Sequence, residues 1–252
     1  MFPGLNRGVV AVGRWDWRRI LSQSMSGRKF RWAGVLWLAA LHMAAADAWR
    51  IMPVGDSITE GGKTFSHYRP LLAEKLRAAG FAVEFVGSRG TPPHSHEGYG
   101  GKTIEFVAAA VPAHFARTPA DIVLVHGGHN HFVEEKPVPG IVAATERLIA
   151  ALRAINPRVV VLVAQVIPSG KLPKYAYIPE LNAELARATA QLHTPAQPVI
   201  VVDQASGFDW RSDTVADLVH PNAAGAEKMA QRWFEALRPI LAAGRPAAAA
   251  VR

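Results

Sequence analysis

Ser57 is the residue in this chain that is best placed to act as a nucleophile. A short apolar run over residues 51–54 ends at Val54, Gly55 turns the chain, and Ser57 follows two residues later. Glycine and polar residues come next, and a helical pattern begins near Ser66. A serine hydroxyl is a weak nucleophile by itself, and it needs a general base and a pocket that stabilises the developing oxyanion. The remaining chain can therefore be searched for a histidine, an acid and an oxyanion hole.

Asp217 and His220 could supply the acid and the base that such a serine requires. They are three residues apart, so one turn can hold the carboxylate against one imidazole nitrogen and leave the other nitrogen free. This arrangement fixes the tautomer and stabilises the imidazolium that forms when His220 accepts the Ser57 proton. The backbone N–H at Gly101 and the side-chain amide of Asn130 could join the Ser57 N–H as oxyanion donors. Glycine suits the first of these positions because the backbone must approach a substrate with no Cβ in the way.

Apolar, mostly β-branched runs alternate with helical patterns along residues 49–243. The runs are typical of strands that are buried on both faces, as in a parallel sheet. This alternation predicts a single three-layer α/β/α domain with a doubly wound, five-stranded parallel sheet. Ligands bind beyond the carboxyl ends of such strands, so the loops that follow the strands should bring the candidate residues to one edge. The expected strands are 50–54, 81–86, 121–126, 159–164 and 199–203, and the expected helices are about 72–79, 140–155, 176–192 and 222–241.

The candidate residues match, in order, the sequence blocks of a known family. The chain resembles the SGNH, or GDSL-type, hydrolases over residues 50–241, which is nearly the whole expected domain. Four ordered blocks are far more specific than any one of them alone. The resemblance implies a flavodoxin-like SGNH hydrolase fold and a serine esterase that needs no cofactor. The matching blocks are 55–58, Gly101 (or Gly100 with a one-residue shift), 128–130 and Asp217 with His220.

Within this family, the chain is most similar to carbohydrate esterases related to the family 3 acetyl xylan esterases. The similarity implies removal of acetyl groups from plant-type polysaccharide. We predict substrate contacts for Asp56, His129 and Tyr99, although bracing its own turn by hydrogen bonds is the main role expected for Asp56. Tyr99 and Trp210 could stack on sugar rings, or they could simply pack. His131 departs from the family pattern, because an aspartate usually follows the third-block asparagine. The similar stretches are 50–61, 68–72, 85–88, 96–98, 178–182 and 220–225.

Clustered histidines could instead bind a metal ion. His126, His129 and His131 lie close together in the sequence, and His94 and His96 lie in another loop at the same expected edge. Zinc requires three or four converging ligands, whereas histidines in polar loops are common without any metal. We therefore predict no metal site.

Residues 1–48 have the three regions of a secretory signal peptide. Residues 26–31 are basic, residues 32–43 are almost wholly apolar, and residues 44–48 end in a small-x-small pattern. Cleavage is expected after this pattern, and Met25 is an alternative start of translation. The apolar run of 12 residues is short for a membrane span of about 20 residues. We therefore predict a secreted or periplasmic protein without a stable membrane anchor after cleavage.

Charge and composition narrow the function further. The leader holds 7 of the 28 Lys and Arg residues but only 2 of the 20 Asp and Glu residues, so residues 49–252 carry a formal net charge of +3. Such a small charge gives no support to nucleic-acid binding. The chain has no cysteine, which excludes disulfides and thiolate metal sites. Residues 49–243 are therefore the expected hydrolase domain, and residues 244–252 are expected to be a flexible tail.

Two other functions are compatible with the sequence. The same serine chemistry could act on lipid-derived esters, as in a lysophospholipase or a thioesterase, but no extended apolar insertion adjoins the predicted edge. The scaffold could also bind carbohydrate without hydrolysing it, which the departure at His131 suggests and the retained serine, histidine, acid and asparagine oppose. The expected partner is therefore an ester of an acetylated carbohydrate.

Overall fold

A parallel β-sheet forms the centre of the part of the chain that the computed structural model describes, residues 48–245. Its main strands have the order β2-β1-β4-β5-β6, which is the flavodoxin-like order, and each pairs in parallel with its neighbours. All five predicted strands are present, with ends that differ by one or two residues. The strands are β1 (Trp49–Gly55), β2 (Val83–Phe85), β4 (Ile122–His126), β5 (Val160–Ala164) and β6 (Val199–Val202).

A sixth strand, β3 (Glu97–Gly98), was not predicted from the sequence. It is only two residues long and pairs with the carboxyl end of β1, where Val54 lies opposite Glu97 and Gly55 lies opposite Gly98. A two-residue strand carries no alternating pattern that a sequence could reveal. Its consequence is local, because it brings the segment after β2 alongside the turn that precedes Ser57.

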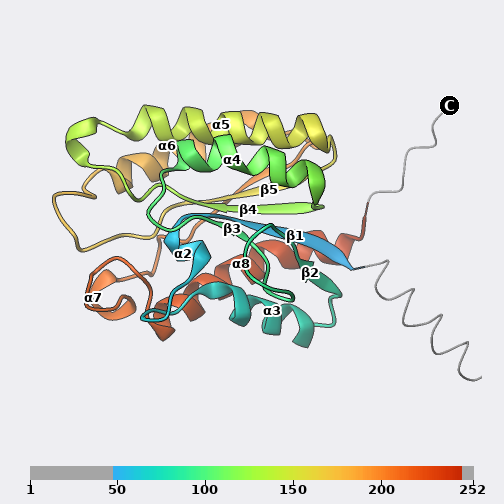
Figure 1. Cartoon of the computed structure of the whole chain (residues 1–252), viewed down its shortest axis with the longest axis horizontal. Coiled ribbons are helices and arrows are strands. Elements are labelled where there is room, and N and C mark those ends of the chain that lie inside the picture. Colours follow the sequence, from blue (N-terminus) through green and yellow to red (C-terminus); the bar gives the residue numbers. More distant parts are fainter. Residues whose placement is uncertain (1–47, 246–252) are drawn as a thin grey trace, which may run out of the picture. The chain divides into compact units, whose positions relative to one another are not determined.

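Helices cover both faces of this sheet (Figure 1). One face is covered by α4 (Ile104–Arg117), α5 (Val138–Ile155) and α6 (Ile178–Leu192), and the other by α3 (Tyr68–Ala78) and α8 (Ala223–Ala243). The three-layer α/β/α domain is therefore as predicted. Three short elements lie in the connecting loops: α2 (Ser57–Glu60), a 3₁₀ turn (Val133–Glu135) and α7 (Trp210–Asp213).

Helix α4 was not predicted from the sequence, and Pro112 lies inside it. Proline within a helix removes one hydrogen bond and costs about 3 kcal/mol. The helix nevertheless buries four large apolar side chains, Ile104, Val107, Val111 and Phe115. Burial of such side chains contributes about 1.5–3 kcal/mol each, so packing against α5 and the sheet outweighs the proline.

The strands bury side chains on both faces, which explains their nearly continuous apolar sequences. In β1, Met52 and Val54 pack in the core layer beneath α4, α5 and α6, whereas Ile51 packs in the layer beneath α3 and α8. Strands β1, β4, β5 and β6 contribute buried side chains to both layers, whereas β2 contributes Phe85 to the layer beneath α3 and α8. The sheet is thus a rigid base whose carboxyl edge carries the loops of interest.

The predicted signal peptide and most of the predicted tail lie outside the described residues. Residues 1–47 and 246–252 are not described, so the cleavage site and the alternative start at Met25 stay predictions. At the other end, α8 stops at Ala243, and the Arg245 guanidinium lies 2.9 Å from the Asp121 carboxylate. Within residues 48–245, no helix has the length and apolar character needed to cross a membrane.

Candidate active site

Ser57 lies at the carboxyl end of β1, as the first residue of the short helix α2. The preceding residue, Asp56, caps this helix by accepting a 3.0 Å hydrogen bond from the Ile58 N–H. Gly55 makes the turn possible because a Cβ there would lie 2.0 Å from the His126 carbonyl oxygen on β4. The N–H groups of a first helical turn have no intrahelical acceptor, and Ser57 is the first residue of this turn.

The structure brings His220 and Asp217 together with Ser57. The Ser57 Oγ and His220 Nε2 atoms are 2.8 Å apart, and the His220 Nδ1 and Asp217 Oδ2 atoms are 2.5 Å apart. The second Asp217 oxygen accepts 2.9 Å hydrogen bonds from the Val219 and His220 N–H groups. Burial raises the pKa of Asp217, but these hydrogen bonds outweigh it and leave the pKa below its ordinary value. An ionised Asp217 therefore holds both its own turn and the imidazole.

The turn between Asp217 and His220 is held in an unusual backbone conformation. Leu218 has a φ of +61°, a region that side chains other than glycine rarely adopt. The Leu218 carbonyl accepts hydrogen bonds from the Gly170 N–H at 2.9 Å and from the Ser169 hydroxyl at 2.8 Å. A strained residue persists only where its surroundings determine its conformation, and these two contacts from the loop after β5 do so here.

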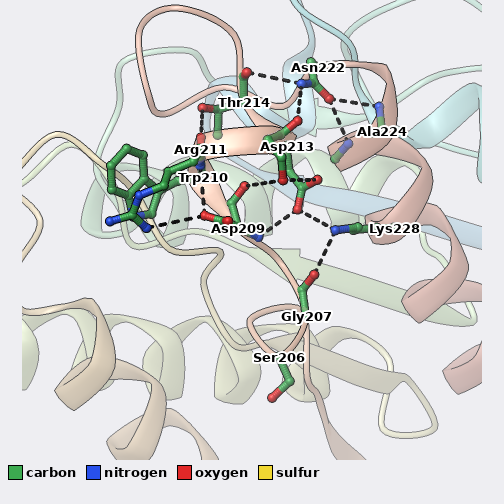
Figure 2. A network of polar contacts seen from close by, with 12 residues as sticks. Ser206, Gly207, Asp209, Trp210, Arg211, Asp213, Thr214, Asn222, Ala224 and Lys228 are labelled. Carbon is green, nitrogen blue, oxygen red and sulfur yellow. Dashed lines mark hydrogen bonds and ion pairs between the residues drawn. The ribbon is translucent and has the colours of Figure 1, made fainter.

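A polar network joins Asn222, which follows the same turn, to α7 and α8 (Figure 2). Asn222 caps α8 by accepting from the Ala224 N–H at 2.9 Å, and its Nδ2 donates to the Ser212 carbonyl at 2.7 Å. The buried Asp213 carboxylate accepts a 2.7 Å hydrogen bond from the Lys228 ammonium of α8. The His220 loop is consequently anchored at its base to two helices as well as to the loop after β5.

Phe65 also contacts the imidazole, and reasoning from the sequence missed it. Its ring stacks on His220 with a centroid distance of 4.1 Å and an interplanar angle of 23°. The stack leaves the Nε2 edge facing Ser57. A phenylalanine in a loop carries no signal in the sequence that would assign it to this contact, because the two rings are 155 positions apart in the chain.

The predicted oxyanion donors Gly101 and Asn130 lie in two loops that a hydrogen bond joins. Asn130 Nδ2 donates to the Lys102 carbonyl at 3.0 Å, which ties it to the residue after Gly101. A Cβ on Gly100 would lie 3.8 Å from the Ser57 Cβ, so this glycine pair adjoins the serine. The Gly100 N–H already donates to Glu60 at 2.8 Å, whereas no acceptor for the Gly101 N–H is found within residues 48–245. Of the two glycines, Gly101 is thus the one with an N–H free for a ligand.

Glu60 links the helix of Ser57 to this glycine loop, and it too was missed. One of its carboxylate oxygens accepts from the Gly100 N–H, and the other pairs with the Arg89 guanidinium. Arg89 in turn lies over the Tyr99 ring, 5.0 Å from its centroid. Glu60 follows Ser57 by three residues on α2, so the same short helix carries Ser57 and holds the glycine loop.

Tyr99 is half-buried beside this loop. Its hydroxyl donates a 2.5 Å hydrogen bond to the Glu97 carboxylate. Burial and the Glu97 carboxylate raise the pKa of Tyr99 to about 12, which keeps the hydroxyl protonated. The predicted substrate contact would therefore use the edge of the ring rather than its hydroxyl.

Asp56 and His129, which were predicted to contact substrate, lie beneath the surface instead. Their side chains are each 2% exposed, and Asp56 Oδ2 lies 3.9 Å from His129 Nδ1. Burial raises the pKa of Asp56 to about 6, against the hydrogen bond from Ile58. Burial, together with the nearby His126, lowers the pKa of His129 to about 3, so this imidazole is neutral. The buried position of Asp56 agrees with its expected role of bracing the turn. Burial of both side chains disagrees with the predicted substrate contacts of Asp56 and His129.

His131, the departure from the family pattern, lies between two glutamates. Its Nε2 is 3.1 Å from Glu105 on α4, and its Nδ1 is 3.4 Å from Glu135. The acid that the family carries at this position is thus replaced by a histidine that meets acids from two neighbouring elements. His131 thus places its two ring nitrogens near carboxylates on both sides of the segment after Asn130.

The remaining histidines form no metal site in the described part of the chain. No group of three or more His, Asp or Glu side chains between residues 48 and 245 is arranged to hold a metal ion. His96 accepts a 2.9 Å hydrogen bond from the Gly98 N–H, and the His94 carbonyl pairs with Arg69. These two histidines therefore shape the loop between β2 and β3.

The Trp210 ring packs against Gly170. A Cβ on Gly170 would lie 2.3 Å from this ring.

A hydroxyl, an imidazole and a carboxylate in this order can deliver a nucleophilic oxygen to a carbonyl carbon. Neighbouring N–H groups can stabilise the resulting oxyanion. Four loops at the carboxyl edge of the sheet supply these groups, which belong to Ser57, Gly101, Asn130, Asp217 and His220.

Comparisons with known proteins point to the same chemistry. The model of the GDSL-like lipase/acylhydrolase family matches residues 54–228. A multidomain esterase of Ruminococcus flavefaciens is 28% identical over 232 residues, which cover 79% of this chain and 30% of that protein. This chain is therefore similar to less than a third of that esterase.

Solved structures of esterases have the same fold. A carbohydrate esterase of family 3 from Talaromyces cellulolyticus has a TM-score of 0.71 and 28% identity, over 78% of this chain and 100% of that one. A family 3 carbohydrate esterase from Clostridium thermocellum has a TM-score of 0.69 and 29% identity, over 78% of this chain and 98% of that one. An acetyl esterase crystallised with acetate has a TM-score of 0.69 and 27% identity, over 77% of this chain and 99% of that one.

Proposed function

Because the chain belongs to the GDSL-like lipase/acylhydrolase family and is a carboxylic ester hydrolase, we propose that it is a secreted serine esterase that removes acetyl groups from carbohydrate. The observation that carries the mechanism is the relay in which Ser57 Oγ lies 2.8 Å from His220 Nε2 and His220 Nδ1 lies 2.5 Å from Asp217. In this mechanism Ser57 attacks the ester carbonyl while His220 accepts its proton. His220 then protonates the leaving alcohol, and an acyl-enzyme remains on Ser57.

The second half of the reaction uses the same groups. His220 takes a proton from a water molecule, whose oxygen attacks the acyl carbonyl. When the bond to Ser57 Oγ breaks and the acid leaves, His220 returns this proton to Ser57 Oγ. The ionised Asp217 stabilises the imidazolium in both halves. The N–H groups of Ser57 and Gly101 and the amide of Asn130 stabilise the oxyanion, and each such donor contributes about 3–4 kcal/mol to lowering the barrier. No step requires a cofactor.

The substrate class rests on the relatives rather than on the geometry. The similar proteins are carbohydrate esterases of family 3 and an acetyl esterase crystallised with acetate. Each is above 25% identical over more than three quarters of this chain, which supports transfer of the acetyl-carbohydrate class. Export is supported by the basic, apolar and small-residue regions of residues 26–48.

The test of the proposed function is hydrolysis of p-nitrophenyl acetate by purified variants. Ser57→Ala and His220→Ala should each remove nearly all turnover while the circular dichroism spectrum and Tm stay close to those of the wild type. Ser206→Ala and His114→Ala, which change the same residue types far from the relay, should keep full activity. Full activity in Ser57→Ala or His220→Ala would refute the mechanism.

Four further measurements test the substrate class and export. Release of acetate from acetylated xylan supports the carbohydrate assignment, whereas turnover that rises along p-nitrophenyl acetate, butyrate and octanoate would favour a lipid ester hydrolase. Binding of xylan without any ester hydrolysis would favour a non-catalytic carbohydrate-binding protein. Mass spectrometry of secreted protein should find an N-terminus at Trp49, and an intact N-terminus ahead of Ala44 would refute cleavage.

A further inference from the structure

A hollow with a volume of about 410 Å³ lies beside the relay, between the first turns of α3 and α8. Helices that follow parallel strands begin at the carboxyl edge of the sheet, so this hollow opens on the same edge as Ser57. Its volume is within the range of about 300–1,000 Å³ that is usual for small-molecule sites. The residues that line it are Gly62, Phe65, Ser66, His67, Pro70, Leu71, Ala223 and Glu227.

Phe65 joins the hollow to the imidazole. The ring that stacks on His220 at 4.1 Å also lines the hollow. The loop of Phe65 is held against the His220 loop, because the Ser66 N–H donates a 2.9 Å hydrogen bond to the Pro221 carbonyl. Phe65 therefore contacts both the hollow and the His220 imidazole, and a backbone hydrogen bond holds its loop against the His220 loop.

The reaction determines which part of a substrate would lie there. His220 must protonate the oxygen of the leaving alcohol, so that oxygen lies at its Nε2 edge. The alcohol side of the ester consequently extends from His220, whereas the acyl carbonyl lies toward Gly101 and Asn130. A hollow that shares a wall with the imidazole is placed to receive the alcohol side and not the acyl group.

The lining has the mixed character that a sugar residue requires. Apolar surface comes from Phe65, Pro70, Leu71 and Ala223, and it suits the C–H face of a pyranose ring. The Ser66 hydroxyl makes no hydrogen bond within residues 48–245, and one Glu227 oxygen pairs with Lys75 at 2.5 Å while the other has no ion-pair partner there. These polar groups are available to bind sugar hydroxyls.

We propose that this hollow is a subsite for a neutral sugar residue next to the acetylated one, on the alcohol side of the scissile ester. The proposal rests on the proposed function, because it takes His220 as the group that protonates the leaving alcohol. It predicts that the protein acts more efficiently on an acetylated oligosaccharide than on an acetylated monosaccharide. A small aryl ester has no second sugar and does not use the subsite.

Leu71→Trp is the central test, because an indole at this position would fill the hollow. It should lower kcat/KM for mono-acetylated xylotriose at least about tenfold, as expected for tenfold weaker binding of this substrate. The same variant should keep kcat/KM for p-nitrophenyl acetate and for mono-acetylated xylose within about twofold. Glu74→Trp is the matched control, since it adds the same group to an exposed position of α3 that does not line this hollow.

A second variant keeps the test decisive if Leu71→Trp folds poorly. Glu227→Gln retains the size of the side chain but weakens its hydrogen bonds to sugar hydroxyls, so it should raise KM for the xylotriose ester and leave p-nitrophenyl acetate turnover unchanged. Glu235→Gln, an exposed glutamate farther along α8, is its control.

The other possible results distinguish failure of the subsite from failure of the proposed function. Unchanged xylotriose turnover in both hollow variants, with an active wild type, refutes the subsite alone. Selective loss of p-nitrophenyl octanoate turnover in Leu71→Trp would assign the hollow to an acyl chain and overturn the proposal. A wild-type protein that hydrolyses no ester refutes the proposed function, and the subsite with it.

Discussion

Replacement of Asp56 by asparagine is expected to stabilise the protein at neutral pH, although Asp56 directly precedes the nucleophile. The Asp56 carboxylate is buried, and it accepts one hydrogen bond from the Ile58 N–H on one oxygen. The other oxygen has no hydrogen-bond partner among the described residues. An asparagine can keep the bond from Ile58 through its amide oxygen, and it carries no charge that must be desolvated.

The magnitude follows from the pKa of Asp56, which burial raises from 3.8 to about 6. Each unit of difference between the folded and the unfolded pKa is worth about 1.4 kcal/mol, so the ionised carboxylate costs up to about 3 kcal/mol. A raised carboxyl pKa means that the folded state binds more protons between pH 4 and 6, so stability falls as pH rises through this window. The advantage of Asp56→Asn should therefore grow by about 2 kcal/mol between pH 4.5 and 7.5.

Urea unfolding of the wild type and of Asp56→Asn at several pH values measures this difference. Comparison of the two proteins is essential, because the lowered pKa values of buried His126 and His129 act in the opposite direction and destabilise both proteins as pH falls below about 6.5. Asp209→Asn is the matched control, since Asp209 caps α7 in the same way but is exposed. A stability difference for Asp56→Asn that does not change with pH would show that the Asp56 pKa is not raised.

Substitutions of three further residues test the arrangement around the relay by their effect on p-nitrophenyl acetate turnover. Asp217→Asn should lower kcat by about a hundredfold or more through loss of the imidazolium partner, yet less than removal of His220, and unchanged activity would mean that another group orients the imidazole. Glu60→Gln should keep most activity because its amide oxygen can still accept from the Gly100 N–H, whereas Glu60→Ala should lower kcat about tenfold; equal activity in the two variants would contradict a role in holding the loop. Phe65→Leu should lower kcat about two- to tenfold, in line with the roughly 0.5–1.5 kcal/mol of a ring pair, and an effect confined to KM would refute its role in placing the imidazole.

The backbone arrangement could be predicted from the sequence because local patterns encode it. Continuous apolar runs predicted each of the five strands of the main sheet, and their alternation with helical patterns predicted the three layers. Helix α4 was not predicted, and the burial that offsets the local cost of its Pro112 arises only from packing against α5 and the sheet. The two residues of β3 are too few for any pattern.

The residues expected to form the relay could also be named from the sequence, since the types and spacing of Ser57, Asp217 and His220 leave few other uses. Their partners could not be named. Phe65, Glu60 and Arg89 have unremarkable positions in the sequence, and they acquire roles only where loops far apart in the chain meet. The burial of Asp56 and His129 likewise depends on what the neighbouring strands and loops cover.

The sequence by itself thus determined the strands, most of the helices and the chemical groups at the ends of the strands, because short-range periodicity and residue type are properties of the chain alone. The tertiary structure alone decided which N–H next to Ser57 stays free, which ring packs on His220 and which polar groups are buried. These are distances between residues that are tens to more than a hundred positions apart, and they are set by packing that no local pattern records.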